Sequence, residues 1–328
     1  MKYTTFSSLP LPVPRLLLGT ASGPFIMGED CKELLDAALA RGLTAIDTAR
    51  NYGLAERSVG DWLEARGCRD RVTILSKCAH PDEATGRDRL NDREIREDLA
   101  QSLSYLHTDV IDIYLLHRDD EKLPAGTAVE ILNALMAEGK IRAFGGSNWR
   151  WQRIEEANEY AYAHNLQPFT FSSPHFSLAR QQTNPWIGEG VSVTGPEGEE
   201  ERAFYRRSGM PLIAYSALGR GMFAGRMKSS DEARMERFLD EFAVKGYGCH
   251  DNFERLARCE KLAAAKGVSV PQTALAWLLG QPENVFAAVT MSSPARMDEN
   301  IAAAELVLTQ DEKDWLDLRR DDLPQAGL

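Results

Sequence analysis

Short runs of almost uninterrupted apolar residues alternate along this chain with longer segments in which apolar residues recur every three or four positions. The longer segments have the period of helices that are buried on one side, and glycines such as Gly42, Gly67 and Gly139 follow their ends. They predict helices at residues 29–40, 55–66, 91–106, 127–138, 151–164, 251–266, 271–279, 294–305 and 309–320, and a short helix that runs through Arg207.

The short apolar runs are predicted strands, at residues 15–20, 43–47, 71–76, 110–116, 141–147, 169–173, 211–216 and 285–290. Because apolar residues occupy both sides of these strands, both faces of the sheet must be covered, which is typical of a parallel sheet with helices packed on it. Eight strand–helix alternations favour a (β/α)8 TIM barrel over an open doubly wound sheet. No linker or repeat divides residues 1–328, so we expect one α/β domain, with long loops at 174–199 and 217–250.

Polar residues in front of several helices predict how those helices begin. Asn91 with Glu94, and Asp251 with Glu254, have the spacing of a capping box, in which two side chains satisfy the first free amides of a helix. Asn148 stands just before the helix predicted at 151–164 and is a candidate cap for it.

The acidic composition limits the partners that this protein can have. The formal net charge is −11, and no cluster of lysine and arginine offsets it. Binding to a nucleic-acid backbone requires a basic surface, so we expect a small-molecule substrate instead. No apolar run approaches the ~20 residues of a membrane span, and the first residues lack a signal-peptide pattern. These features predict a cytoplasmic protein without a membrane partner.

The five cysteines have no metal-binding or redox-motif spacing. In a chain of this length they are expected to be reduced thiols, and no metal site is expected. We expect a monomer or a weak homo-oligomer.

Four reactive side chains follow three consecutive predicted strands. Asp47 ends the second strand, Tyr52 lies five residues beyond it, Lys77 follows the third strand and His117 follows the fourth. Active-site residues of a (β/α)8 barrel lie at the carboxyl ends of its strands, so these four should meet on one rim. A buried ammonium that is held by a carboxylate should lower the pKa of a nearby phenol, and a neutral imidazole can orient a carbonyl group. This set is suited to protonating a carbonyl oxygen as hydride is added.

The same residues resemble those of the aldo-keto reductase superfamily. The similarity includes Asp-Thr-Ala-x-x-Tyr-Gly-x-Ala-Glu at 47–56, Gly-Gly-Ser-Asn at 145–148, Tyr-Ser-x-Leu-Gly-Arg-Gly at 215–221 and Arg-x-x-Glu-Asn at 296–300. It extends in the right order over roughly residues 15–305. The resemblance implies that Tyr52 donates the proton, that Lys77 and Asp47 tune it, and that His117 orients the carbonyl.

The resemblance also implies a site for a nicotinamide cofactor, with NADPH favoured over NADH. Ser147 and Asn148 would hold the carboxamide, Tyr215 would stack on the ring, and Arg296 would bind a 2′-phosphate. The complete set of expected cofactor residues is Gly19, Thr20, Asp47, Ser147, Asn148, Ser173, Tyr215, Ser216, Ala217, Leu218, Gly219, Arg220, Gly221, Thr290, Ser292, Arg296, Glu299 and Asn300. Two positions depart from the family pattern: Ser172 or Ser173 replaces a glutamine, and the segment 290–293 lacks the usual cation.

Substrate choice in such barrels depends on long loops. Phe25 and Trp149, together with Tyr52 and His117, are the expected substrate residues, and Trp186 lies in another candidate loop. Such an aromatic mouth suits a sugar-like aldehyde. Two alternatives remain open: a lyase that uses Lys77 as a Schiff-base nucleophile, and an NADP(H)-binding regulatory or redox-sensing subunit with vestigial turnover.

Overall fold

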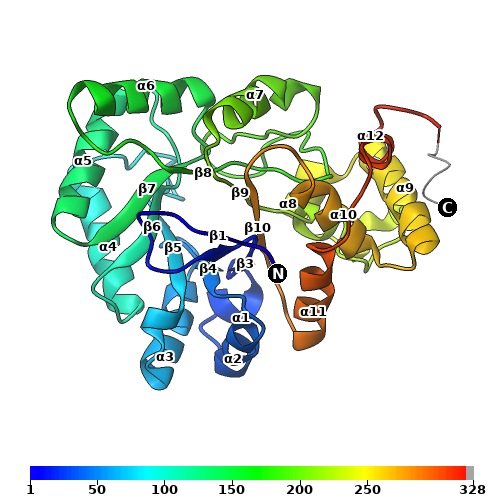
Figure 1. Cartoon of the computed structure of the whole chain (residues 1–328), viewed down its shortest axis with the longest axis horizontal. Coiled ribbons are helices and arrows are strands. Elements are labelled where there is room, and N and C mark those ends of the chain that lie inside the picture. Colours follow the sequence, from blue (N-terminus) through cyan, green and yellow to red (C-terminus); the bar gives the residue numbers. More distant parts are fainter. Residues whose placement is uncertain (323–328) are drawn as a thin grey trace.

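The computed structural model describes residues 1–322 and shows a closed barrel of eight parallel strands (Figure 1). Around the barrel the strands follow the order β10-β3-β4-β5-β6-β7-β8-β9. Their bounds are β3 (Leu16–Gly19), β4 (Ala45–Asp47), β5 (Thr73–Cys78), β6 (Ile111–Leu116), β7 (Ile141–Ser147), β8 (Phe171–Ser173), β9 (Leu212–Ala214) and β10 (Val285–Val289). The predicted (β/α)8 TIM barrel is therefore confirmed.

Helices surround the barrel and cover the outer face of its sheet (Figure 1). They are α1 (Gly23–Ile26), α2 (Lys32–Ala40), α3 (Ala55–Arg66), α4 (Asp92–Tyr105), α5 (Ala125–Ala137), α6 (Trp151–Ala163), α7 (Glu199–Ser208), α8 (Glu241–Tyr247), α9 (His250–Lys266), α10 (Val270–Leu279), α11 (Pro294–Ala303) and α12 (Gln310–Leu316). Among residues 1–322, no helix combines the length and the apolarity that a membrane crossing requires.

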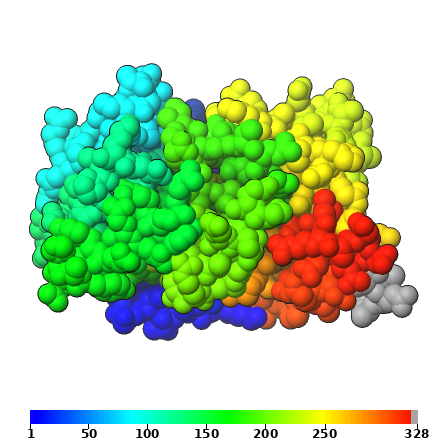
Figure 2. Space-filling view, turned by 90° about the horizontal axis from the view of Figure 1, so that it is seen from above, coloured from blue at the N-terminus to red at the C-terminus, as the bar shows by residue number. Residues whose placement is uncertain are grey.

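The barrel is closed at its amino-terminal end by the start of the chain. Strands β1 (Tyr3–Thr4) and β2 (Val13–Pro14) form a small antiparallel pair, and Phe6 between them packs against the core inside the barrel. The Phe6 ring lies 4.9 Å from that of Phe171 and 5.8 Å from that of Phe286. In the space-filling view these first residues, in blue, lie along one side of the molecule (Figure 2). The open mouth is therefore at the carboxyl ends of the strands.

Several local predictions were wrong. The loop predicted at 217–250 contains α8 and short 3₁₀ turns, and the lead-in that precedes β3 forms β1 and β2. Helix α9 begins at His250, so Asp251 is inside its first turn and does not cap it. Asn148 is not a cap either, because α6 begins at Trp151 and its cap position is Arg150. The Asn91 cap is confirmed, since its side chain accepts a hydrogen bond from the amide of Glu94.

The cysteines are unpaired thiols, and four of the five are buried. The reduced state of these thiols remains a prediction.

Candidate active site

The strand order brings Asp47, Lys77 and His117 together. Asp47 is the last residue of β4, Lys77 lies next to the end of β5, and His117 directly follows β6. These strands are adjacent in the barrel and pair in parallel, so the three side chains lie on the same rim. All three are almost completely buried, with 5%, 2% and 6% of their surface exposed.

Lys77 and Asp47 form a buried ion pair. The Lys77 Nζ donates to Asp47 Oδ1 at 2.5 Å and to the carbonyl oxygen of Thr48 at 3.0 Å. Burial by itself lowers the pKa of Lys77, but the charge and hydrogen bond of Asp47, together with Tyr52, outweigh burial and raise it. Lys77 is therefore an ammonium at neutral pH.

Tyr52 is held above this pair by a tight turn. Its amide donates to the carbonyl oxygen of Ala49 at 3.0 Å, and Gly53 follows with a left-handed φ of 55°. A Cβ at Gly53 would lie 2.7 Å from the carbonyl oxygen of Ile26, so this position requires glycine. The Lys77 Nζ lies 5.0 Å from the centre of the Tyr52 ring.

Glu56 fixes the far side of the turn. Its carboxylate is completely buried in α3, where it accepts hydrogen bonds from Arg50 Nη1 at 2.7 Å and Ser76 Oγ at 2.6 Å. Because Arg50 precedes Tyr52 in the turn and Ser76 precedes Lys77 in β5, this one carboxylate ties together the two segments that carry the phenol and the amine.

The pKa of Tyr52 is raised, which contradicts the expected direction. Burial is the largest cause, Lys77 opposes it, and the negative charge of Asp47 adds to it. The sequence shows the neighbouring amine, but the degree of burial depends on the folded chain. As a result, Tyr52 is protonated at neutral pH, which is the form a proton donor requires.

His117 is a neutral imidazole across the site from Tyr52. The ring centres are 5.8 Å apart at an interplanar angle of 74°. Burial, Arg118, Lys77 and His80 all lower the pKa of His117 to well below its ordinary value. Its Nδ1 is buried without a hydrogen-bond partner among the described residues. An uncharged ring with unused hydrogen-bonding capacity can bind a carbonyl oxygen.

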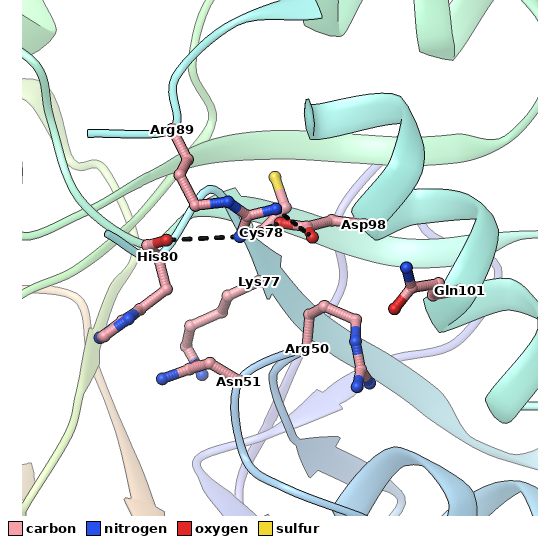
Figure 3. A pocket seen from close by; sticks show the side chains of 8 residues that line it. All are labelled: Arg50, Asn51, Lys77, Cys78, His80, Arg89, Asp98 and Gln101. Atoms are coloured by element: carbon pink, nitrogen blue, oxygen red, sulfur yellow. Dashed lines mark hydrogen bonds and ion pairs between the residues drawn. The ribbon is translucent and has the colours of Figure 1, made fainter. Parts of the chain in front are cut away.

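A polar cavity of about 270 Å³ lies beside the catalytic rim, between the end of β5 and α4 (Figure 3). Arg89 crosses one side of it and donates to Asp98 of α4 and to the carbonyl oxygen of His80. The full lining is Arg50, Asn51, Lys77, Cys78, His80, Arg89, Asp98 and Gln101. Because neither Tyr52 nor His117 lines it, this cavity is not the substrate mouth.

Two expected substrate residues are in the core. Phe25 is 2% exposed, and Trp149 is fully buried with its ring 5.0 Å from that of Phe169. The left-handed φ of 58° at Asn148 changes the direction of the chain at the end of β7, and Trp149 packs beneath it, against Gly146. The assignment of Phe25 and Trp149 to the mouth was therefore wrong.

Trp186, from the loop after β8, is also engaged within the protein. Its ring stacks on Phe242 of α8 at 5.1 Å, and the guanidinium of Arg220 lies over both rings.

Comparison with known proteins agrees with this geometry. The model described as "Aldo/keto reductase family" matches residues 15–318. The chain belongs to the aldo/keto reductase family. It is 28% identical to aldo-keto reductase str7 of Strobilurus tenacellus (85% of this chain, 78% of that protein). It is 29% identical to protein tas of Escherichia coli K12 (95% of each chain) and 26% identical to norsolorinic acid reductase stcV of Emericella nidulans (87% of this chain, 72% of that protein).

Members of the aldo/keto reductase family are oxidoreductases that act on small carbonyl compounds and generally use a nicotinamide cofactor. In this aldo/keto reductase, the residues expected to hold the nicotinamide end or directly follow β3, β7, β8 and β9 on the catalytic rim. Tyr215 donates its hydroxyl to Asn148 Oδ1 at 2.8 Å, and Asn148 Nδ2 donates to Ser147 Oγ at 3.1 Å. Ser147 and Ser173 donate to backbone carbonyl oxygens. The side chains of Tyr215, Asn148 and Ser147 are thus already joined in one hydrogen-bonded chain that ends at the carbonyl oxygen of Ser173.

The segment after β9 has the backbone shape of an anion site. Ser216, Gly219, Arg220 and Gly221 have φ values of 52°, 57°, 49° and 103°. Such left-handed residues turn successive amides toward one concave side, which suits a pyrophosphate.

The start of α11 can hold a second phosphate. Ser293 caps this helix, Thr290 and Ser292 are exposed just before it, and Arg296 is in its first turn. The Arg296 guanidinium is 39% exposed and paired with Glu299, while Asn300 is buried on the inner side of the helix. The donor set therefore fits a phosphorylated dinucleotide.

Arg118 was missed by the sequence analysis although it directly follows His117. Arg118 is almost completely buried, which its position after a predicted strand does not reveal.

Proposed function

We propose that this protein reduces the carbonyl group of a small aldehyde or ketone to an alcohol, with NADPH as the hydride donor and Tyr52 as the proton donor. The observation that carries the proposal is the buried Lys77–Asp47 pair at 2.5 Å beneath the Tyr52 ring, with neutral His117 facing that ring. A protonated phenol, a fixed cation and an uncharged hydrogen-bonding ring converge where a carbonyl oxygen would lie.

Each residue has a distinct part in this reaction. Bound cofactor supplies the hydride that the carbonyl carbon accepts. His117 binds the carbonyl oxygen and orients it, and the Tyr52 hydroxyl gives its proton to that oxygen as negative charge develops there. The Lys77 ammonium then stabilises the phenolate, and Asp47 keeps the ammonium in place and charged. The raised pKa of Tyr52 keeps the proton in place until the oxygen becomes a strong base.

NADPH is proposed over NADH because of the start of α11. A partly exposed arginine beside two serines forms a favourable site for a 2′-phosphate, and Glu299 must release Arg296 to complete it. Fluorescence titration should show tighter binding of NADPH than of NADH, and Arg296→Ala should remove most of that difference. Equal affinities in the unchanged protein would contradict the assignment.

The geometry argues against the lyase. A Schiff-base nucleophile must be an uncharged amine, whereas the raised pKa of Lys77 and its two hydrogen bonds keep it as an ammonium. The other alternative, a regulatory subunit with vestigial turnover, predicts a rate of carbonyl reduction far below that of ordinary enzymes.

The deciding experiment is Tyr52→Phe, with Tyr162→Phe as a control because Tyr162 is 67% exposed and remote in sequence from the rim residues. Loss of the proton donor should lower kcat about 10²- to 10⁴-fold with several aldehydes, while NADPH affinity stays the same. Tyr162→Phe should retain full activity. Turnover in Tyr52→Phe that equals turnover in the natural protein would refute the proposal.

The burial of the expected aromatic residues removes the support for sugar-like aldehydes as substrates. That expectation depended on an aromatic mouth, and Phe25 and Trp149 are buried while Trp186 is stacked on Phe242. Exposed apolar residues instead lie along the turn that carries Tyr52, where the amide of Leu54 donates to the carbonyl oxygen of Ile26; they are Ile26, Met27 and Leu54. A cytoplasmic location and a monomeric or weakly oligomeric state remain predictions.

A further inference from the structure

Arg118 is a buried cation in the active site that has no carboxylate partner. Only 5% of its surface is exposed. Its Nε donates to the carbonyl oxygen of Ile187 at 3.1 Å, and its Nη1 donates to that of His117 at 2.9 Å. Its Nη2 has no hydrogen-bond partner among residues 1–322 and is not sealed from solvent. One end of the guanidinium is therefore fixed by the backbone, and the other end is unoccupied.

No acidic side chain in the described part of the chain lies within ion-pair distance of Arg118. The adjacent Asp119 is bound instead by Arg153, at 2.8 Å. A buried charge without a counter-charge costs several kcal/mol, and a neutral side chain such as glutamine could donate to the same carbonyl oxygens. The positive charge is therefore not explained by the packing of the loop, and a ligand that brings a negative charge would compensate it.

The position of Arg118 is firmly set. A Cβ placed on Gly188 would lie 3.2 Å from the Arg118 Cγ and 3.2 Å from the Pro81 Cγ, so the aliphatic part of Arg118 is held where the loops after β5 and β8 meet. Its charge reaches the groups of the catalytic site: it lowers the pKa of His117 and His80 in addition to the effect of burial. The guanidinium is therefore fixed beside the catalytic residues, within electrostatic reach of His117, Tyr52 and Tyr215.

The proposed phosphate sites of a dinucleotide are not adjacent to Arg118 in the barrel. Arg118 follows β6, and the proposed phosphate sites follow β9 and β10. In the closed strand order, β6 is four positions from β10 in either direction and three positions from β9, so neither phosphate site is next to Arg118. The ligand that would lie beside His117, the carbonyl substrate, is therefore the better source of a negative charge.

We propose that Arg118 binds a carboxylate of the substrate, so that the preferred substrates are aldehydes or ketones that carry a carboxylate close to the carbonyl group. This deepens the proposed function and rests on it. Lys77 is neutralised by its ion pair with Asp47, whereas the positive charge of Arg118 has no carboxylate partner among the described residues. A carboxylate neutralises that charge, whereas a phosphate dianion would leave a buried excess of negative charge.

The test compares three formylbenzoates, with the carboxylate at position 2, 3 or 4, and their methyl esters. Each pair has the same reacting aldehyde and differs in the negative charge. For the natural protein, kcat/KM should be higher for the acid than for the ester in at least one pair. The acid-to-ester ratio is the kcat/KM of the acid divided by that of its ester. In Arg118→Gln this ratio should fall about 10- to 100-fold for that pair, as expected for a lost charge-assisted hydrogen bond. Arg118→Lys should retain part of the preference for the acid.

Arg150→Gln is the matched control, because Arg150 is 57% exposed and pairs with Glu121 on the surface. Its acid-to-ester ratio should equal that of the natural protein. An acid-to-ester ratio that is the same in Arg118→Gln and in the natural protein, or ester preference in all three pairs, would overturn the proposal.

Binding of benzoate separates this proposal from the proposed function. Benzoate should raise the melting temperature of the natural protein with NADPH, benzamide should not, and Arg118→Lys should respond more than Arg118→Gln. If no aldehyde is reduced, the proposed function fails, but this pattern would still support a carboxylate site at Arg118. If aldehydes are reduced and benzoate acts equally on all variants, the function stands and the carboxylate site is refuted.

Discussion

The most informative perturbation is a double-mutant cycle at the Asp47–Lys77 pair. Both side chains are buried, with 7% and 2% exposed, and their charged atoms are 2.5 Å apart. Asp47→Asn leaves a buried ammonium with neutral acceptors and no counter-charge, and Lys77→Met leaves a buried carboxylate. Each single variant should lose about 3–5 kcal/mol of unfolding free energy, because breaking a buried pair leaves an uncompensated charge.

The double variant removes both charges and changes side-chain volume little. It should therefore be no less stable than either single variant, so the coupling energy should be about 3 kcal/mol or more. Because the pair raises the pKa of Lys77, its contribution is fully present below the unfolded pKa of 10.5 and is lost as the pH rises through the folded pKa. At pH 7 the whole effect should be observed.

Urea unfolding at pH 7, followed by circular dichroism and by tryptophan fluorescence, measures the four free energies, and coincident curves justify a two-state fit. The control cycle uses Asp92→Asn and Arg96→Met, an exposed pair at 2.8 Å with 59% and 38% of the side chains exposed. Its coupling should be about 0.5 kcal/mol or less.

Activity provides a second criterion for this cycle. The double variant should recover stability but not turnover, because it lacks the ammonium below Tyr52. A coupling energy at Asp47–Lys77 that is no larger than in the control cycle, or turnover that recovers together with stability, would refute this account of the site.

Three further predictions test particular positions. Gly53→Ala should lower kcat/KM about 10- to 100-fold by displacing the catalytic turn, whereas Gly23→Ala, with open space around its Cβ, should not; equal effects would contradict this. Burial raises the pKa of Glu201 to about 7, so folding stability should fall as the pH rises from 4.5 through 7. Urea unfolding should then show Glu201→Gln more stable than the natural protein by ~1–2 kcal/mol at pH 8 and not at pH 5. Trp149→Phe should lower the melting temperature without changing the order of preference among aldehydes, because the indole is buried. A changed order would show that Trp149 contacts the substrate.

The sequence by itself determined the barrel and the composition of the catalytic rim. The apolar runs identified all eight strands, and helix α3 has the predicted bounds. Once the strands are parallel and adjacent, residues at their carboxyl ends must share a rim. Asp47, Lys77 and His117 were therefore placed together by position alone.

Only the tertiary structure decided what surrounds those residues. The direction of the Tyr52 pKa shift follows from burial that outweighs a neighbouring ammonium, and burial depends on contacts from distant segments. Trp149 is in the core because the backbone turns at Asn148, which a pattern of residue types does not show. Arg118 became a buried cation only when the loops after β5 and β8 met around it. Periodicity and strand ends are local properties of a chain, whereas burial and the balance of charge arise from segments that folding brings together.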